Sequence, residues 1–230
     1  MATISRVAFI GFGDIAKSFI KRWESKMPDV LCAYDNKIES SSQKQSLLME
    51  YINHGVQGTF YPDEATMGAE LIFCTVEPSD VQDAIEQVRE SLKSGCYFFD
   101  CSELTPDSKQ QLASNFHADT HYIDVAIISS LNEQACSISV LISGAEALRA
   151  AASLKQLNFD VYVVSDKAGD ATMMNTIGAT WFEGLETLTD QCVSEAKRAG
   201  LEKSILDYLS NHQPEQEMPK LSDAMLARLD

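Results

Sequence analysis

Basic residues are scarce in this 230-residue sequence. It has 18 lysines and arginines against 34 aspartates and glutamates, which gives a formal charge of −16 at pH 7. Binding to nucleic acid needs a basic surface that neutralises phosphates, and contact with anionic lipids needs clustered lysines and arginines. We therefore expect neither a nucleic-acid partner nor a polybasic membrane contact.

Long apolar runs are missing as well. No stretch approaches the roughly 18 uninterrupted apolar residues that a membrane-spanning helix needs. The first ten residues contain no charged leader followed by a long apolar core, which is the pattern of a secretory signal. We expect no membrane segment and a cytoplasmic location.

Cysteine and histidine do not cluster. The six cysteines include no Cys-x-x-Cys pair, four of them lie in apolar runs typical of buried strands, and the four histidines are scattered. With 45% hydrophobic residues, the composition is that of an ordinary globular protein that needs no disulfides. We expect free thiols and no bound metal.

Short apolar runs alternate with segments of helical period over the first 165 residues. We expect strands at 6–10, 30–34, 56–60, 70–76, 96–100, 122–128, 137–142 and 161–164, and helices at 14–26, 40–51, 78–93, 105–116 and 146–157. Alternation with short connections is typical of a mostly parallel sheet with helices on both faces. The sequence therefore predicts a doubly wound α/β domain over residues 1–165.

The pattern changes after residue 165. From 168 to 208 there is no β-like run and no proline, only helical periodicity with one break near Gly200. Pro214 and Pro219 bracket a polar loop before a last short helix near 221–229. We expect a smaller all-α domain over 166–230. Because a long amphipathic segment beside a complete sheet needs a partner surface, we also expect a homodimer through these helices.

A glycine-rich turn, Gly11-Phe-Gly13-Asp-Ile-Ala16, joins the first predicted strand to the first predicted helix. In dinucleotide-binding loops the first glycine permits a tight turn, the second lets the backbone approach the pyrophosphate, and the alanine allows close helix packing. Asp35 closes the second strand, where a carboxylate can accept both ribose hydroxyls of NAD. An ordinary turn with a capping acid is the alternative interpretation. Since Asp35 would repel the 2′-phosphate of NADP and Lys37 is the only nearby cation, we expect NAD, with NADP possible.

Three further motifs follow in an order that resembles a known superfamily. They are Asp100-Cys-Ser102-Glu-Leu-Thr-Pro106, Asp124-Val-Ala-Ile-Ile-Ser-Ser130 and a long helix that opens with Gly169-Asp-Ala-Thr. The order resembles the β-hydroxyacid dehydrogenases, which include 6-phosphogluconate and 3-hydroxyisobutyrate dehydrogenases. It resembles most the phosphogluconate dehydrogenase-like branch, which has a C-terminal domain of unknown function.

The resemblance implies a fold and an activity. The first domain would be of the Rossmann type, and the helical domain, shorter than in the family, would complete the active site with a second subunit. The activity would be NAD(P)-dependent hydride transfer to or from a small hydroxy acid, keto acid or imine.

The resemblance also implies site residues. The implied cofactor-binding positions are Gly11, Phe12, Gly13, Asp14, Ile15, Asp35, Asn36, Thr75, Val76 and Glu77. Ser102 matches a serine that holds the substrate near the nicotinamide. Ser129 and Ser130 stand in the substrate loop, where the family has glycines that present backbone N–H groups to a carboxylate. Asn175 stands where the family has its catalytic lysine.

Asn175 leaves three hypotheses open. Its amide does not titrate near neutral pH and carries no charge to stabilise an alkoxide, while general acid–base catalysis contributes about 10²–10⁴-fold. The first hypothesis is an oxidoreductase whose proton carrier is another group, with Tyr122, Asp124 and Glu183 as alternatives, or whose iminium substrate needs less acid assistance. The second is a catalytically degenerate dinucleotide-binding protein, a sensor or scaffold. The third is a fold that has lost both cofactor and chemistry.

Overall fold

The computed structural model describes residues 4–23, 26–116, 119–128 and 137–211. The chain divides into two compact units, 1–177 and 178–230, and the division lies inside helix α7 (Asp170–Ala199). The boundary expected after residue 165 lies before this helix, whereas the first two turns of α7 belong to the first unit.

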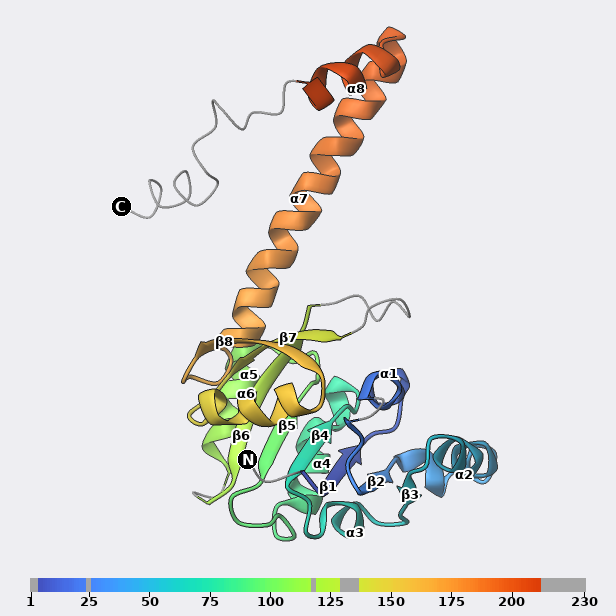
Figure 1. The fold of residues 1–230 in the computed structure, drawn as a ribbon, viewed down its shortest axis with the longest axis vertical. Coiled ribbons are helices and arrows are strands. Elements are labelled where there is room, and N and C mark those ends of the chain that lie inside the picture. Colours follow the sequence, from blue (N-terminus) through green and yellow to red (C-terminus); the bar gives the residue numbers. More distant parts are fainter. Residues whose placement is uncertain (1–3, 24–25, 117–118, 129–136, 212–230) are drawn as a thin grey trace. The chain divides into compact units, whose positions relative to one another are not determined.

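The described strands of the first unit form an eight-stranded sheet with the order β3-β2-β1-β4-β5-β6-β7-β8 (Figure 1). They are β1 (Arg6–Ile10), β2 (Val30–Tyr34), β3 (Gln57–Gly58), β4 (Leu71–Cys74), β5 (Tyr97–Asp100), β6 (His121–Ile127), β7 (Ile138–Ser143) and β8 (Phe159–Ser165). Strands β1 to β6 pair in parallel, β7 is antiparallel to β6, and β8 is parallel to β7. The prediction of a Rossmann-type, mostly parallel sheet followed by a helical region is confirmed.

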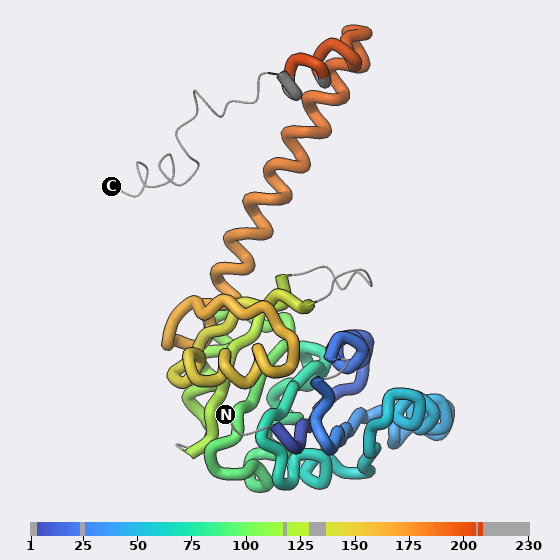
Figure 2. The backbone as a smooth tube through the Cα atoms, viewed as in Figure 1, coloured from blue at the N-terminus to red at the C-terminus, as the bar shows by residue number. Residues whose placement is uncertain are grey.

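The helices alternate with these strands, as Figure 2 shows along the coloured trace. They are α1 (Asp14–Trp23), η2 (Asn36–Glu39), α2 (Lys44–Asn53), α3 (Pro62–Thr66), η3 (Pro78–Asp80), α4 (Val81–Val88), α5 (Pro106–Ser114), α6 (Ala147–Gln156), α7 and α8 (Glu202–Asn211), where η marks a 3-10 helix. Helix α4 is shorter than expected and ends at Val88, whose carbonyl accepts the hydroxyl of Ser91 at 2.7 Å and its backbone N–H at 2.8 Å. The short helix α3 was missed, although Pro62 is well suited to a first helical position.

The core explains why these strands are apolar at every position. All residues from Val7 to Ile10 and from Leu71 to Cys74 are buried, which is typical of parallel strands covered on both faces. The ring of Phe73 stacks on Phe9 and Phe99, with centroids 5.5 and 5.0 Å apart. Such aromatic pairs add about 0.5–1.5 kcal/mol each beyond the burial of their area.

The strand order fixes where a ligand can bind. Strand β1 lies between β2 and β4, so the chain leaves β1 toward one side of the sheet and later returns on its other side at β4. At such a switch point the loops after the two strands diverge and open a crevice at the carboxyl edge of the sheet. The loops after β1, β4 and β5 follow one another along that edge.

The second unit contains the rest of α7 and α8. Gly200 has φ +68°, and the backbone N–H of Leu201 donates to Ala196 O at 2.9 Å, which is the usual closure of a helix by a left-handed glycine. The expected break near Gly200 is therefore confirmed. The two prolines and the last short helix predicted beyond residue 211 lie outside the described residues. Among the helices that the structure describes, none has a long enough apolar stretch to cross a bilayer.

Candidate functional site

Gly11 and Gly13 have different roles in the turn between β1 and α1. Gly11 has φ +88°, and a Cβ at this position would lie 2.8 Å from the carbonyl carbon of Thr75 and 2.9 Å from the nitrogen of Val76. Both the conformation and the close approach of the β4 loop therefore require glycine. A Cβ on Gly13 would meet no atom within 4 Å. Gly13 thus leaves open space beside the first turn of α1, where backbone N–H groups and the helix dipole favour an anion.

Phe12 lies between the two glycines in the sequence, and its side chain points into the core. Its ring is fully buried and lies 5.0 Å from the ring of Tyr51, centroid to centroid. Its backbone N–H donates to Asp35 Oδ2 at 2.8 Å. The sequence could not show which way this side chain points, and only the backbone of Phe12 belongs to the site.

Asp35, at the end of β2, forms a hydrogen bond with the glycine loop. Only 6% of the residue is exposed. One carboxylate oxygen accepts the Phe12 N–H, and the other accepts the Lys37 N–H at 2.9 Å and caps η2. The Lys37 ammonium lies 3.9 Å from Oδ2. Because each carboxylate oxygen can accept a second hydrogen bond, Asp35 can still receive a ribose hydroxyl.

A cleft of about 410 Å³ lies between the loops after β1, β2 and β4, and we call it the loop cleft. Seven of the ten expected cofactor residues line it: Gly11, Gly13, Asp35, Asn36, Thr75, Val76 and Glu77. Phe12, Asp14 and Ile15 are not among the residues that line it. The Asp14 carboxylate instead pairs with Lys17 at 3.0 Å on the surface of α1.

The loop cleft is strongly acidic. Among its described lining residues, five carboxylates face a single lysine: Asp35, Glu39, Glu77, Asp80 and Asp83 against Lys37. The phenol of Tyr34 also lines the cleft and donates to Glu39 at 2.9 Å. Burial, together with this hydrogen bond, raises the pKa of Tyr34 to about 12. The cleft therefore disfavours each additional negative charge on a ligand.

A second cleft, of about 270 Å³, lies at the carboxyl ends of β5 and β6, and we call it the β5–β6 cleft. Ser102 and Asn175 both line it, so the structure brings together the two residues expected to be catalytic. The other polar residues that line it are Glu103, Thr172 and Thr176. Its apolar wall includes Ile15 from α1, the helix that follows the glycine turn. Ser129 and Ser130 lie outside the described residues.

Ser102 belongs to a buried ionic network that the sequence did not reveal. Asp100 and Asp124 are paired in the register of β5 and β6, and both side chains are fully buried. The fully buried ammonium of Lys109, from α5, lies 3.1 Å from Asp100 Oδ1 and 3.6 Å from Asp124 Oδ1. The Ser102 hydroxyl donates to Asp100 Oδ1 at 2.5 Å, and the Tyr122 hydroxyl donates to Asp100 Oδ2 at 2.6 Å. Lysine is needed here because buried charges persist only when they are paired.

Asp124 fixes the start of α7. Its carboxylate accepts the N–H groups of Gly169 and Thr172 at 3.0 and 3.1 Å, and the Thr172 hydroxyl at 2.7 Å. A negative charge at a helix N-terminus is stabilised by the helix dipole. Since Asn175 lies one turn after Thr172, this cap also sets the position of Asn175 at the β5–β6 cleft.

Neither Tyr122 nor Asp124 lines the β5–β6 cleft, where a proton carrier would have to act. Burial and the negative charge of Asp100 raise the pKa of Tyr122 well above its ordinary value. Asp124 is fully buried and accepts hydrogen bonds from α7 and from the Ser143 hydroxyl, at 3.0 Å. Glu183 belongs to the second unit. In the described part of the chain, no group of three or more histidine, cysteine, aspartate or glutamate side chains is arranged to hold a metal ion.

Part of this chain matches a known protein family. Residues 6–102 match the model of the family described as "NADP oxidoreductase coenzyme F420-dependent". This match contains β1, the glycine turn, Asp35, the β4 loop and Ser102. A comparison with curated proteins gives no significant match.

Several solved structures share the fold over most of this chain. A conserved hypothetical protein from Sinorhizobium meliloti is 22% identical with a TM-score of 0.78, over 94% of this chain and 72% of that one. The 3-hydroxyisobutyrate dehydrogenase of Mycobacterium tuberculosis, solved with L-serine, is 15% identical with a TM-score of 0.75, over 90% and 70% of the two chains. An imine reductase from Aspergillus terreus, in complex with NADPH4, is 15% identical with a TM-score of 0.77, over 99% and 78%.

These findings agree with the order of motifs read from the sequence. The predicted resemblance is confirmed at the level of the fold: residues 6–102 match the model of an NADP oxidoreductase family, and the chain shares its fold with a 3-hydroxyisobutyrate dehydrogenase and an imine reductase.

Proposed function

We propose that the protein is an NAD(P)-dependent oxidoreductase that transfers hydride to or from a small hydroxy acid, keto acid or imine. The observation that carries the proposal is the loop cleft at the switch point of the sheet, together with the β5–β6 cleft at the carboxyl ends of two further strands of the same sheet. The loop cleft has the residues of a dinucleotide site, and the β5–β6 cleft is large enough for a small substrate. The family match and the imine reductase neighbour support the same activity.

The residues of the loop cleft fit a dinucleotide. The open space at Gly13 and the N-terminus of α1 would hold the pyrophosphate, Asp35 would accept the ribose hydroxyls, and the segment from Thr75 to Glu77 would lie along the nicotinamide ribose. The cofactor supplies the hydride. The family name and the neighbour with NADPH4 point to NADP. The five carboxylates of the loop cleft favour NAD, which lacks the 2′-phosphate, and we propose NAD as the preferred cofactor.

A second candidate function follows from Asn175. Among the described residues that line the β5–β6 cleft there is no lysine or histidine to carry a proton. This observation favours a protein that binds dinucleotide without turnover, as a sensor or scaffold. It is equally compatible with an enzyme whose substrate needs no proton from the protein.

A turnover experiment separates these two functions. With purified protein and NADH, we expect oxidation of NADH in a screen that covers keto acids, aldehydes and cyclic imines. If Asn175 limits proton transfer, Asn175→Lys is expected to raise hydroxyacid oxidation at alkaline pH, by up to about 10²-fold. The exposed Asn53→Lys serves as the matched control. NADH binding without turnover of any substrate would favour the sensor, and an unchanged rate in Asn175→Lys would contradict the role given to this position.

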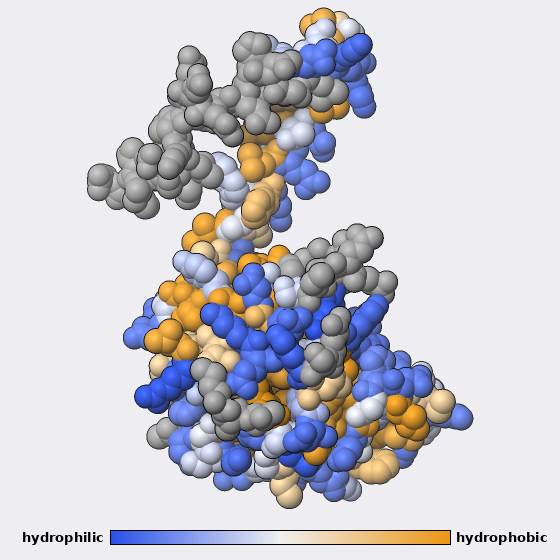
Figure 3. Space-filling view, in the orientation of Figure 1, coloured by the Kyte–Doolittle hydropathy of each residue, from blue (hydrophilic) through white to orange (hydrophobic). Residues whose placement is uncertain are grey.

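We also propose a homodimer through the C-terminal helices. Large apolar residues recur every three or four positions along α7 and are 42% to 59% exposed: Met173, Ile177, Trp181, Leu185 and Leu188. Figure 3 shows hydrophobic residues along this helix. Such a stripe is typical of a helix that packs against a partner.

Light scattering at micromolar concentration is expected to give twice the 25.4 kDa mass of the chain. Trp181→Glu is expected to yield a monomer, because a charge would replace an apolar contact in the interface. Thr187→Glu, an exposed polar position on the same helix, is expected to leave the dimer intact. A wild-type mass of one chain would contradict the proposal. The cytoplasmic location stays a prediction.

A further inference from the structure

Three of the residues that line the β5–β6 cleft have hydroxyl groups whose hydrogens are already donated inside the protein. Ser102 Oγ donates to Asp100 at 2.5 Å and Thr172 Oγ1 donates to Asp124 at 2.7 Å. Thr176 Oγ1 donates to the carbonyl of Thr172 at 3.0 Å. The first two directions are fixed, because a carboxylate paired with Lys109 can only accept hydrogen bonds. Toward a ligand, Ser102 and Thr172 therefore present lone pairs.

Reversing the direction of the Ser102 and Thr172 hydrogen bonds would cost free energy. Asp100 and Asp124 are fully buried, so a hydroxyl that turned toward a ligand would leave a buried carboxylate with one hydrogen bond fewer. A buried acceptor without its donor costs more than the new bond returns, and most of all when it is charged. The hydroxyls of Ser102 and Thr172 therefore act as acceptors at this cleft.

The charge of the β5–β6 cleft favours the same kind of ligand as its hydrogen-bond acceptors, a cation. Among the described lining residues, Glu103 is the one carboxylate, and there is no lysine, arginine or histidine. The Cys101 thiol also lines the cleft, and burial raises its pKa, so it stays neutral. Asn175 is an amide that can donate as well as accept. Among the described side chains that line this cleft, a carboxylate ligand would meet the lone pairs of Ser102 and Thr172 and the like charge of Glu103, with the amide of Asn175 as a donor.

We infer that the β5–β6 cleft selects a protonated nitrogen, an ammonium or iminium group, and rejects the carboxylate that the β-hydroxyacid dehydrogenase resemblance implies. Ser102 and Glu103 are the specificity-determining residues. The ligand preference follows from the cleft alone, while its place in a reaction rests on the proposed oxidoreductase function.

An iminium substrate also removes the need for a lysine at position 175. If NADH gave a hydride to the carbon of an iminium ion, the C=N electron pair would move onto nitrogen and neutralise its charge. The products would be a neutral amine and NAD⁺, and no proton would be required from the protein. Reduction of a ketone would instead create an alkoxide that needs a proton.

The test compares two small ligands of opposite charge by saturation-transfer NMR at 0.15 M salt, with and without NADH. The probes are piperidine hydrochloride and sodium isobutyrate. We expect piperidinium to bind the wild-type protein at least tenfold more tightly than isobutyrate. Ser102→Ala is expected to weaken piperidinium binding by roughly tenfold, the usual worth of a hydrogen bond to a charged group. Glu103→Lys is expected to invert the preference.

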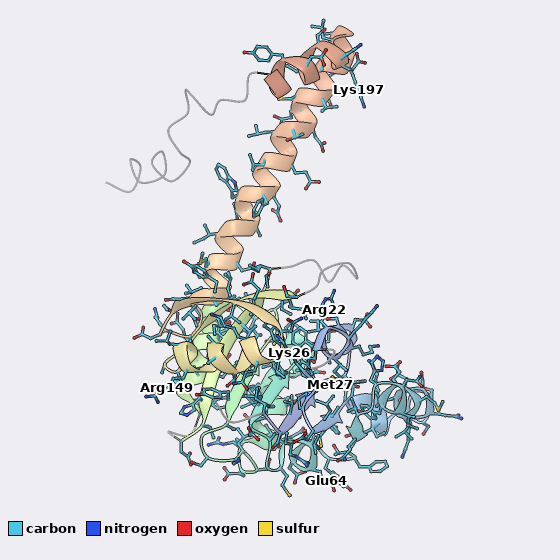
Figure 4. The ribbon with its side chains drawn as sticks, viewed as in Figure 1. Arg22, Lys26, Met27, Glu64, Arg149 and Lys197 are labelled. Atoms are coloured by element: carbon cyan, nitrogen blue, oxygen red, sulfur yellow. The ribbon has the colours of Figure 1, made fainter. Side chains whose placement is uncertain are left out.

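The matched control is Glu64→Gln, which removes an exposed carboxylate from helix α3 of the first unit (Figure 4). It is expected to leave both affinities unchanged, which separates the cleft from the overall charge of −16. Equal or tighter binding of isobutyrate, absence of piperidinium binding, or an effect of Glu64→Gln as large as that of Glu103→Lys would each overturn the inference. Absence of NADH binding alongside a clear piperidinium preference would overturn the oxidoreductase function and leave the ligand preference standing.

Discussion

Gly13→Asp is expected to weaken NADH binding by about 100-fold or more while the protein stays folded. A side chain at Gly13 meets no protein atom within 4 Å of its Cβ, so the substitution causes no clash. It places a carboxylate where the pyrophosphate would bind. Two unit charges 4 Å apart repel by about 1 kcal/mol in water and about 4 kcal/mol at the effective dielectric of a protein surface. Fluorescence titration with NADH measures the change.

Gly13→Ala is the matched control, since it adds a Cβ without a charge and is expected to lose less than tenfold in affinity. Thermal unfolding of both variants should stay close to that of the wild type. Gly11 does not serve for this purpose, because its φ of +88° and the backbone of Thr75 2.8 Å from its Cβ position make any substitution a test of folding. Equal NADH affinity in Gly13→Asp and wild type would show that the pyrophosphate does not lie at this turn.

Lys109→Met is expected to lower the free energy of unfolding by about 3–5 kcal/mol. The ammonium lies 3.1 Å from Asp100 and 3.6 Å from Asp124, and all three side chains are fully buried. Methionine fills a similar volume but leaves two buried carboxylates with no cation. Domains are stable by only about 5–15 kcal/mol, so the loss would be a large part of the total. Urea unfolding followed by far-UV circular dichroism gives the value.

Two further variants test the cause of this loss. Lys155→Met, on the exposed side of α6, is expected to change the stability by less than about 0.5 kcal/mol. Adding Asp100→Asn to Lys109→Met removes one of the two uncompensated charges and is expected to recover part of the loss. A stability of Lys109→Met within about 1 kcal/mol of the wild type would contradict the pairing of these three groups.

Local sequence patterns were enough to predict the buried strands and the glycine turn. The run Leu71–Cys74 is apolar at every position because both faces of β4 are covered. The glycine turn and Asp35 were found from spacing, and the structure joins them through the hydrogen bond from Phe12 N–H. The side chain of Phe12 could not be placed in advance, because the direction of a residue in a turn depends on the packing beneath it.

The buried network could not be predicted because its members come from separate segments. Asp100 and Asp124 become neighbours only through the register of β5 and β6, and Lys109 reaches both from α5. One local signal exists: Lys109 and Leu112 are spaced like the buried positions of a helix, and the structure buries both. A lysine in such a position indicates an acidic partner in the core.

Ser102 and Asn175 illustrate a different kind of prediction. Neither hydrophobic periodicity nor residue spacing predicts that the end of β5 lies near the second turn of α7. The resemblance to a superfamily predicted that Ser102 and Asn175 belong to one site, and both residues line the β5–β6 cleft. What the resemblance could not provide is the hydrogen-bond direction of Ser102, which is set by the buried Asp100.

The most direct test of the proposed function is an equilibrium titration of the wild-type protein with NADH and NADPH, followed by nicotinamide fluorescence. The account predicts saturable binding of both cofactors at the loop cleft, with NADH bound more tightly because that cleft has five carboxylates and one lysine among its described lining residues. No response to either nucleotide at millimolar concentration would contradict both the oxidoreductase and the dinucleotide-binding sensor.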